Sequence, residues 1–389
     1  MTKRIYLDYA ATTPVDPRAM KAMLPYFSQK FGNTMSLHSF GQEAKQVLEE
    51  SRQIIADVIS ADPEEIIFTG SATESNNMAL KGTVWANKNN NKHIIISPIE
   101  HDCVLETAKW LETQGMQITK LPVDKYGLVN PRDVAKAIKP ETILVSIIHA
   151  SNEIGTIQDL AAIGNICRKR GVYFHTDASQ SFGKILINVK AMDIDLLTAS
   201  SRKMYGPPGA ALLFVRKGVK IIPLLHGGGH EAGLRSSTSN IPAIAGFAAA
   251  AEIYKKERKK EWNSLVKLRD KLIRGILKIP NSHLNGHPEK RLPNNVNIWF
   301  DFIEGESIVI QLDLLGVAAS TGSACSSAKL EPSHVLMALG LKAEQAHGSL
   351  RLSVGRFTKE SEINFVLKVL PGIVKNLREI SPFKKDYKF

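Results

Sequence analysis

The sequence predicts an α/β fold with a large, mostly parallel sheet and a smaller second domain. Short apolar runs, which indicate buried strands, alternate with stretches whose apolar residues recur every three to four positions, as in helices. The strands are expected at residues 65–69, 93–97, 142–149, 172–176, 196–199 and 211–215, and helices between them at residues 42–59, 73–82, 103–113 and 159–170. Because this alternation is typical of parallel sheets, ligands are expected at the carboxyl ends of the strands.

The second domain is predicted from a change in composition near residues 255–262, where the chain becomes strongly charged. A helix over residues 243–277 leads into Pro280-Asn281-Ser282 and then into another strand pattern at residues 295–300. We therefore expect a large domain over residues 15–255. Residues 1–14 and 256–389 are expected to form a small α+β domain.

Composition and cysteine content narrow the class of protein. The 389 residues are 43% hydrophobic, so the chain can bury a large core. Asp8 interrupts the start before any long apolar stretch, and no apolar run reaches the roughly 18 residues that a membrane span needs. The chain has three cysteines, Cys103, Cys167 and Cys325, and this odd number favours a reducing compartment. Their spacing does not fit a zinc site, so no metal is expected. We expect a cytoplasmic protein.

The formal net charge of +12 raises the question of a nucleic-acid partner. The basic residues are scattered, with clusters only at residues 255–260 and 384–388, and neither cluster is interleaved with aromatic residues for base stacking. A solvated basic face explains this pattern, so nucleic acid is not expected as a stable partner.

The first candidate site follows the strand at residues 65–69. Gly70 permits a tight turn there, and Ser71 with Glu74 has the spacing of a capping box at the start of a helix. Free backbone N–H groups and the helix dipole at such a start suit a phosphate. An ordinary helix start would look the same, so this pattern alone leaves both readings open.

Three further candidates follow other strands. An apolar strand ends at Asp177, whose carboxylate could cap a turn or hold a protonated ring nitrogen. Lys203 follows a strand and a Ser-Ser-Arg turn and precedes the rigid Gly206-Pro207-Pro208-Gly209 bend. A polar turn that contains Asn152 follows the strand at residues 142–149.

Taken in this order, the segments resemble the cysteine desulfurases of the NifS/IscS type, within class V of the fold-type I enzymes that depend on pyridoxal phosphate (PLP). The resemblance runs from Leu7-Asp8-Tyr9-Ala10-Ala11-Thr12-Thr13-Pro14 to Arg351-Leu352-Ser353-Val354-Gly355-Arg356. Its most specific part is Ser320-Thr321-Gly322-Ser323-Ala324-Cys325-Ser326-Ser327, which resembles the active-cysteine loop of the family and lies in the expected small domain.

The resemblance implies a role for each matching position. Lys203 matches the lysine that binds PLP covalently and moves the Cα proton of the substrate. Asp177 matches the carboxylate that keeps the pyridinium nitrogen protonated, and Gln180 matches a donor to the ring oxygen of PLP. His101 matches the histidine that stacks on the ring and helps with proton transfers.

The remaining matches concern the phosphate and the substrate carboxylate. Ala72, Thr73, Ser200 and Arg202 match cofactor-binding positions, and Thr238 matches a phosphate ligand supplied by the second subunit of a homodimer. Asn152 and Arg351 match the groups that receive the carboxylate of L-cysteine, and Asn152 also belongs to the cofactor site. Arginine suits this task because its planar fork binds both carboxylate oxygens.

The implied reaction converts L-cysteine to L-alanine and leaves the sulfur as a persulfide on Cys325, whose thiolate is the nucleophile. Cys103 and Cys167 are expected to be packing residues. The implied acceptor of the sulfur is a partner protein, such as an iron–sulfur scaffold or a tRNA-thiolation relay. A selenocysteine lyase and a class V aminotransferase remain alternatives. A non-enzymatic scaffold would not need Lys203, Asp177, His101 and Cys325 together.

Three positions depart from the family pattern. Gly70-Ser71 replaces Ser-Gly, which puts the detailed geometry of the phosphate loop in doubt. Arg202 replaces a histidine before the lysine, and because arginine also donates to phosphate, we expect tighter retention of the cofactor. Pro208 replaces a lysine that is common after Tyr-Gly-Pro.

Overall fold

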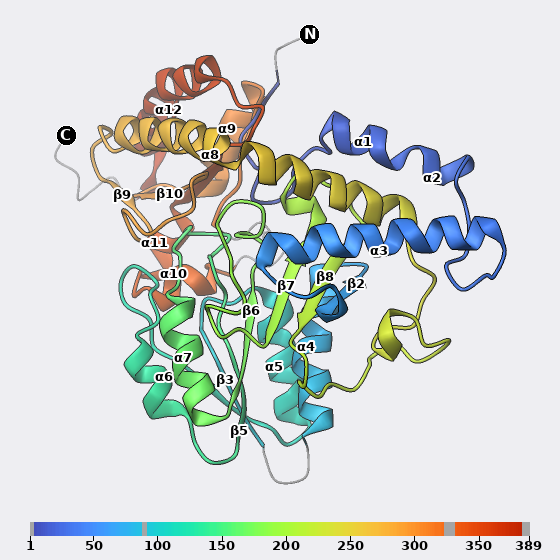
Figure 1. The fold of residues 1–389 in the computed structure, drawn as a ribbon. Coiled ribbons are helices and arrows are strands. Elements are labelled where there is room, and N and C mark those ends of the chain that lie inside the picture. Colours follow the sequence, from blue (N-terminus) through green and yellow to red (C-terminus); the bar gives the residue numbers. More distant parts are fainter. Residues whose placement is uncertain (1–3, 88–91, 323–330, 383–389) are drawn as a thin grey trace.

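The computed structural model describes residues 4–87, 92–322 and 331–382. Its largest unit is a seven-stranded sheet in the order β2-β8-β7-β6-β5-β3-β4 (Figure 1). The strands from β7 to β4 run parallel to their neighbours, whereas β8 runs antiparallel to β7 and β2, so the expected mostly parallel sheet is confirmed. Their bounds are β2 (Ile66–Thr69), β3 (His93–Ile96), β4 (Gln117–Lys120), β5 (Thr142–Ser146), β6 (Tyr173–Asp177), β7 (Leu196–Ser200) and β8 (Ala211–Val215).

The expected strands agree with the sheet to within one residue, except for β5. The prediction for that strand extended to residue 149, but β5 ends at Ser146. The main chain beyond it still donates from Ile147 to His175 O and from His149 to Asp177 O, which explains the longer apolar run. Edge strand β4 was not predicted, because its Gln-Ile-Thr-Lys sequence is partly exposed and has no apolar run.

The sheet is buried on both faces, which is why its strands are apolar without alternation. Neighbouring residues of one strand point to opposite faces, so Leu197 packs in one core and Leu196 in the other. The first face is covered by α3 (Ser39–Ile59), α7 (Leu160–Arg170) and the start of α8 (Ile241–Ile276), and the second by α4 (Ala72–Ala86) and α5 (Asp102–Thr113). Shorter helices of this part are α1 (Pro17–Met23), α2 (Pro25–Ser28) and α6 (Pro131–Ala137).

Helix α8 leaves the large sheet and continues into a second core (Figure 1). This core is built on the three-stranded antiparallel sheet β12-β10-β9 and on the parallel pair β1-β11. The strands are β1 (Ile5–Tyr6), β9 (Ser282–Leu284), β10 (Asn295–Phe300), β11 (Val317–Ala318) and β12 (Ser349–Ser353), and the helices are α9 (Gly305–Leu314), α10 (His334–Ala338), α11 (Ala343–His347) and α12 (Glu360–Ile380). The bounds expected for the two domains stay a prediction.

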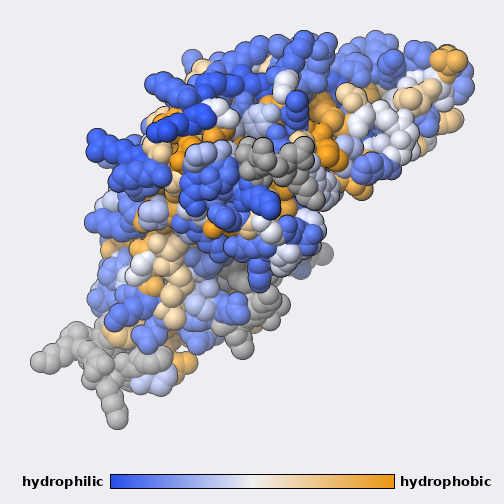
Figure 2. Space-filling view, turned by 90° about the horizontal axis from the view of Figure 1, so that it is seen from below, coloured by the Kyte–Doolittle hydropathy of each residue, from blue (hydrophilic) through white to orange (hydrophobic). Residues whose placement is uncertain are grey.

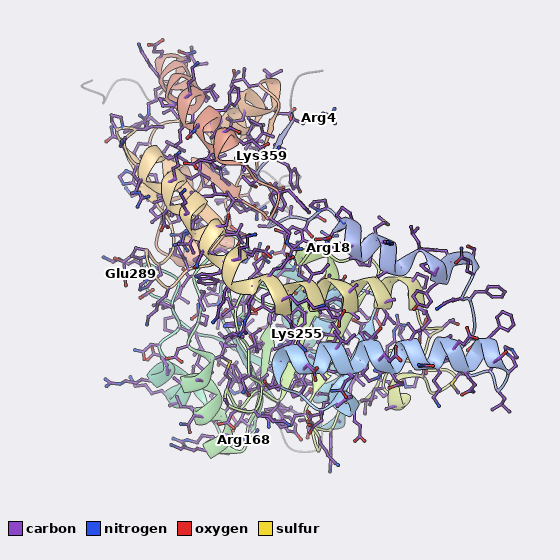
Figure 3. The ribbon with its side chains drawn as sticks, turned by 45° about the horizontal axis from the view of Figure 1, so that its top comes forward. Arg4, Arg18, Arg168, Lys255, Glu289 and Lys359 are labelled. Atoms are coloured by element: carbon purple, nitrogen blue, oxygen red, sulfur yellow. The ribbon has the colours of Figure 1, made fainter. Side chains whose placement is uncertain are left out.

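Ion pairs join the helices that lie over the first face of the sheet. Arg18 of α1 donates to Glu257 of α8 at 2.5 Å, and Lys255 of α8 donates to Asp57 of α3 at 3.1 Å (Figure 3). Both pairs are exposed, so the packed apolar faces beneath them contribute most of the stabilisation. Among the described residues, no helix is long and apolar enough to span a bilayer.

Candidate active site

A cavity of about 420 Å³ lies at the carboxyl ends of β6 and β7, as expected for ligands of such a sheet. It brings together the following predicted residues: Ala72, Thr73, His101, Asn152, Asp177, Gln180, Ser200, Arg202, Lys203 and Arg351. Thr238 is exposed and does not line it. Cys325 lies outside the described residues. A larger cavity of about 760 Å³ beside the starts of α6 and α7 contains none of the predicted residues.

The start of α4, where a phosphate site was predicted, lines one part of the cavity. Ser71 is the N-cap, and its side chain accepts from Glu74 N at 3.1 Å. The predicted capping box differs in its second bond, because the Glu74 carboxylate accepts from Gly70 N at 2.8 Å rather than from Ser71. Arg235 donates to the same carboxylate at 2.7 Å and fixes its direction. The Gly70-Ser71 order therefore forms a closed turn that opens a regular helix.

Asp177 ends β6 and is held by two donors. Ser179 N donates to Oδ1 at 2.8 Å, and Asn76 Nδ2 of α4 donates to Oδ2 at 2.7 Å. Asp177 is 4% exposed and Asn76 is fully buried. The two donors fix the direction of both carboxylate oxygens of Asp177 at the edge of the cavity.

His101 is the N-cap of α5, and its position fixes the proton of its ring. Cys103 N donates to His101 Nδ1 at 3.2 Å, so Nδ1 is an acceptor and the proton of the neutral ring lies on Nε2. Cys103 Sγ lies 3.1 Å from the same nitrogen and 3.0 Å from Asn76 Nδ2. Cys103 was expected to be a packing residue; it packs beside α4 but also lines the cavity and contacts these two polar groups.

Lys203 is placed by main-chain groups of the N-terminal segment. Its Nζ donates to Ala10 O at 2.8 Å and to Ala11 O. Gln180 Nε2 also donates to Ala10 O at 2.8 Å. Lys184 Nζ bonds to Gln180 O at 2.9 Å and to Lys203 O at 3.0 Å, which ties together the turns after β6 and β7. Burial, and to a smaller extent the nearby charge of Lys203, lower the pKa of Lys184 to about 7.

Two buried carboxyl groups in the cavity were not predicted. Glu100 Oε1 accepts from Ser97 Oγ at 2.5 Å and from Ile148 N at 2.6 Å, while its Oε2 is buried without a partner among the described residues. Burial raises the pKa of Glu100 to about 8. Glu153 accepts from Ser333 Oγ at 2.5 Å, and burial raises its pKa to about 7. Burial therefore favours the protonated form of both groups.

Arg351 of β12 reaches the cavity with 2% of its side chain exposed. Its Nη1 donates to Asn152 O at 3.3 Å, and its Nη2 donates to Asp8 Oδ1 at 2.9 Å. Arg351 therefore contacts the main chain of Asn152, the other residue predicted to receive the substrate carboxylate. Arg202 is exposed and donates to Ala11 O at 3.0 Å, so its predicted contact with phosphate stays a prediction.

The residues of the cavity fit PLP. An amine, a fixed carboxylate and the N-terminus of a 15-residue helix suit the aldehyde, the ring nitrogen and the phosphate of this cofactor. Gln180 Oε1 and Ser179 Oγ are buried without a partner among the described residues, and a polar ring edge would satisfy such groups.

Sequence reasoning missed Asn76, Glu100, Glu153 and Asp8. Asn76 lies three residues after Thr73 on the same helix, so the helical period was the signal that could have found it. Glu100 precedes His101, and Glu153 follows Asn152, but nothing in a single sequence distinguishes a buried glutamate from an exposed one. Asp8 lies 343 positions from Arg351 in the sequence, so only the folded structure reveals their contact.

Comparison with known proteins decides the family. Residues 5–366 match the aminotransferase class-V family. The chain belongs to this family. Among the relatives of this class-V protein, "Cysteine desulfurase IscS" of Methanosarcina thermophila is 50% identical over 387 residues, which cover 99% of this chain and 96% of that one. "Cysteine desulfurase, mitochondrial" of Saccharomyces cerevisiae is 48% identical and covers 98% of this chain and 77% of that one.

Solved structures agree with these relatives. A "NifS-like protein" that is 37% identical superposes with a TM-score of 0.91, over 96% of this chain and 100% of that one. "SspA in complex with cysteine" is 36% identical, with a TM-score of 0.82, over 92% of this chain and 100% of that one. The resemblance to cysteine desulfurases, the fold-type I class and PLP as the cofactor of the family are thus confirmed. The roles of individual residues stay predictions.

Proposed function

We propose that this class-V protein is a PLP-dependent cysteine desulfurase that converts L-cysteine to L-alanine and carries the sulfur as a persulfide on Cys325. The observation that supports it most strongly is the convergence of Lys203, Asp177, His101 and Arg351 on one cavity in a chain with such relatives. PLP, when bound, supplies an electron sink for the bond changes at the substrate Cα.

The residues of the chain divide the remaining work. Arg351 and Asn152 bind and orient the substrate carboxylate. Lys203 holds the cofactor and moves the proton at Cα, and Asp177, held by Asn76 and Ser179, keeps the ring nitrogen protonated. His101 directs its Nε2 proton away from the helix that it caps, so it serves first as a donor.

The sulfur of the substrate is transferred to the thiol of Cys325. The Cys325 thiolate attacks the sulfur of the substrate, a new S–S bond forms, and the C–S bond breaks with its electron pair retained by the carbon side. Protonation of that carbon gives L-alanine. The net reaction joins L-cysteine and the thiol to give L-alanine and the persulfide, with no outside oxidant. The persulfide then passes to an acceptor protein, such as an iron–sulfur scaffold, in the cytoplasm.

Mass spectrometry after incubation with L-cysteine tests this function. We expect the mass of one sulfur atom to be added to the peptide that contains Cys325. Cys325→Ser should abolish sulfide and alanine release while PLP stays bound, and Cys167→Ser, at a buried position, is the matched control that keeps turnover. If Cys325→Ser keeps single turnover without added thiol, the aminotransferase alternative takes precedence.

The active unit is proposed to be a two-fold homodimer in which Thr238 completes the phosphate site of the partner. Thr238 is exposed and outside the cavity of its own chain. Large apolar side chains are exposed on α2 and between it and α3, including Phe27, Phe31 and Leu37, and Figure 2 shows hydrophobic surface at this end of the molecule. Sedimentation should show a dimer, and a fully active monomer would refute the shared site.

A further inference from the structure

The guanidinium group of Arg351 already has partners at both terminal nitrogens. Nη2 donates to Asp8 Oδ1 at 2.9 Å, and Nη1 donates to Asn152 O at 3.3 Å. Arginine has five N–H donors, and Arg351 Nε is buried without a partner among the described residues. One further N–H on each terminal nitrogen is left for a substrate carboxylate, which is the number that a bidentate contact uses.

Asp8 is itself fixed on its other side. Its Oδ2 accepts from Ser320 Oγ at 3.1 Å. Ser320 and Arg351 are bridged by two main-chain bonds, from Arg351 N to Ser320 O at 2.7 Å and from Ser320 N to Arg351 O at 3.2 Å. Asp8, Ser320 and Arg351 therefore form a closed triangle of contacts. The carboxylate cannot turn away from the guanidinium without losing a second bond.

We propose that Asp8 is a positioning residue for the substrate carboxylate. It fixes the guanidinium plane of Arg351, which orients the bound carboxylate. It also partly neutralises the charge of Arg351, which weakens binding enough to keep it reversible. This inference rests on the proposed role of Arg351. A buried cation without a countercharge is costly, and Asp8 is the carboxylate that contacts this one in the described residues. When the substrate binds, its carboxylate and Asp8 share one positive charge and repel each other.

The two functions of Asp8 separate in two variants. Asp8→Asn keeps the oxygen that accepts from Arg351 and lets the new amide donate to Ser320 Oγ, but it removes the charge. It should lower KM for L-cysteine several-fold. Asp8→Ala removes both contacts, frees the guanidinium and should raise KM about 10- to 100-fold. kcat should change little in both, because Lys203 and Asp177 are untouched.

A matched control comes from a second acid of the same N-terminal segment. Asp16 accepts from Arg356 Nη1 at 2.6 Å and from Arg18 Nη2 at 2.8 Å, and its side chain is 2% exposed, but it does not line the cavity. Asp16→Asn should lower the melting temperature and leave KM unchanged. If it shifts KM as the Asp8 variants do, general loosening of this segment explains the effect and the inference fails.

The experiment measures KM and kcat for L-cysteine, the dissociation constant of L-alanine and the melting temperature of each holoenzyme. The dissociation constant of L-alanine should change as KM does: it should fall in Asp8→Asn and rise in Asp8→Ala. An unchanged KM in both Asp8 variants, or a rise in both, overturns the inference. Arg351→Lys separates this failure from that of the proposed function. If Arg351→Lys leaves KM unchanged, the proposed carboxylate site is wrong. If Arg351→Lys raises KM but the Asp8 variants leave KM unchanged, only the inference about Asp8 is wrong.

Discussion

Two walls of the cavity differ in how the fold builds them. The sheet wall consists of Asp177, which ends β6, and of Lys203 and His101, which lie in the connections after β7 and β3. The terminal wall consists of Ala10, Ala11 and Arg351, with Asp8 behind the arginine. The sheet wall consists of acidic and basic side chains, whereas the terminal wall supplies main-chain carbonyls and the guanidinium of Arg351.

In the function proposed above, the sheet wall carries out the bond chemistry and the terminal wall places the substrate. The sheet wall is rigid because Asp177 ends β6 and His101 caps α5. Asn76 of α4 holds Asp177, and Lys184 ties together the turns after β6 and β7. The terminal wall depends on contacts between residues far apart in sequence, such as the 343 positions between Asp8 and Arg351. Changes in the sheet wall should therefore reduce kcat, and changes in the terminal wall should alter KM.

The largest effect is expected for Lys203→Ala, because it removes the amine that we propose to hold the cofactor and to move the Cα proton. Turnover should fall by at least about 10²- to 10⁴-fold. Borohydride reduction of the wild type should fix PLP on Lys203, as peptide mass spectrometry would show. Lys184→Met is the matched control, since it removes a nearby amine and should leave the adduct on Lys203. If Lys203→Ala still forms an adduct that borohydride reduces, Lys203 is not the lysine that binds PLP.

A smaller effect on the same wall is expected for Asn76→Ala. It removes one of the two donors to Asp177 and leaves Cys103 Sγ with His101 as its partner. Hydrogen bonds to charged groups contribute ~1.5–3 kcal/mol, so kcat should fall about 10- to 100-fold while KM changes little. Asn77→Ala, whose side chain donates only to Thr73 O among the bonds of the described residues, is the control. Equal losses in the two variants would contradict a specific role for Asn76.

The smallest effect on turnover is expected for Glu100→Gln, a change next to His101 in the sheet wall. Its expected effect is on the free energy of unfolding and its dependence on pH. The pKa of Glu100 is about 8 in the folded protein, against an ordinary value of 4.5. Between these values the folded state holds a proton that the unfolded state has released, so rising pH lowers the free energy of unfolding. The glutamine variant lacks this titration, and we expect it to gain a few kcal/mol on the wild type between pH 5 and pH 8.5.

Urea unfolding at several pH values measures this difference. Glu106→Gln on α5 is the control, because that side chain is 71% exposed, and it should follow the wild-type curve. Parallel curves for the wild type and Glu100→Gln would show that Glu100 ionises in the folded protein as it does in the unfolded chain.

Asp177 and Lys203 of the sheet wall could be singled out from the sequence because strand ends are local features, whereas His101 was found only through the family resemblance. The apolar run before Asp177 and the turn before Lys203 are visible within ten residues of each group. Their roles came from the family resemblance rather than from the pattern. The terminal wall could not be assembled in this way, because no local signal pairs Asp8 with Arg351 or directs Lys203 to the Ala10 carbonyl. The capping box at Ser71 was half wrong for the same reason, since distant Arg235 fixes the direction of Glu74.

The terminal wall also sets the order in which the protein matures on the ribosome. Leu7 O accepts from Ser353 N at 2.7 Å, and Ala10 N donates to Ser353 Oγ at 2.8 Å, so the segment made first is completed by the segment made near the end. At ~5–20 residues per second, this delay is roughly 17–70 s. Throughout it, the fully buried Leu7 has no core to enter, and the large sheet is synthesised before its cavity can close. All strands of the large sheet are therefore synthesised before the cavity can be completed, and the site can form only when nearly the whole chain has been made.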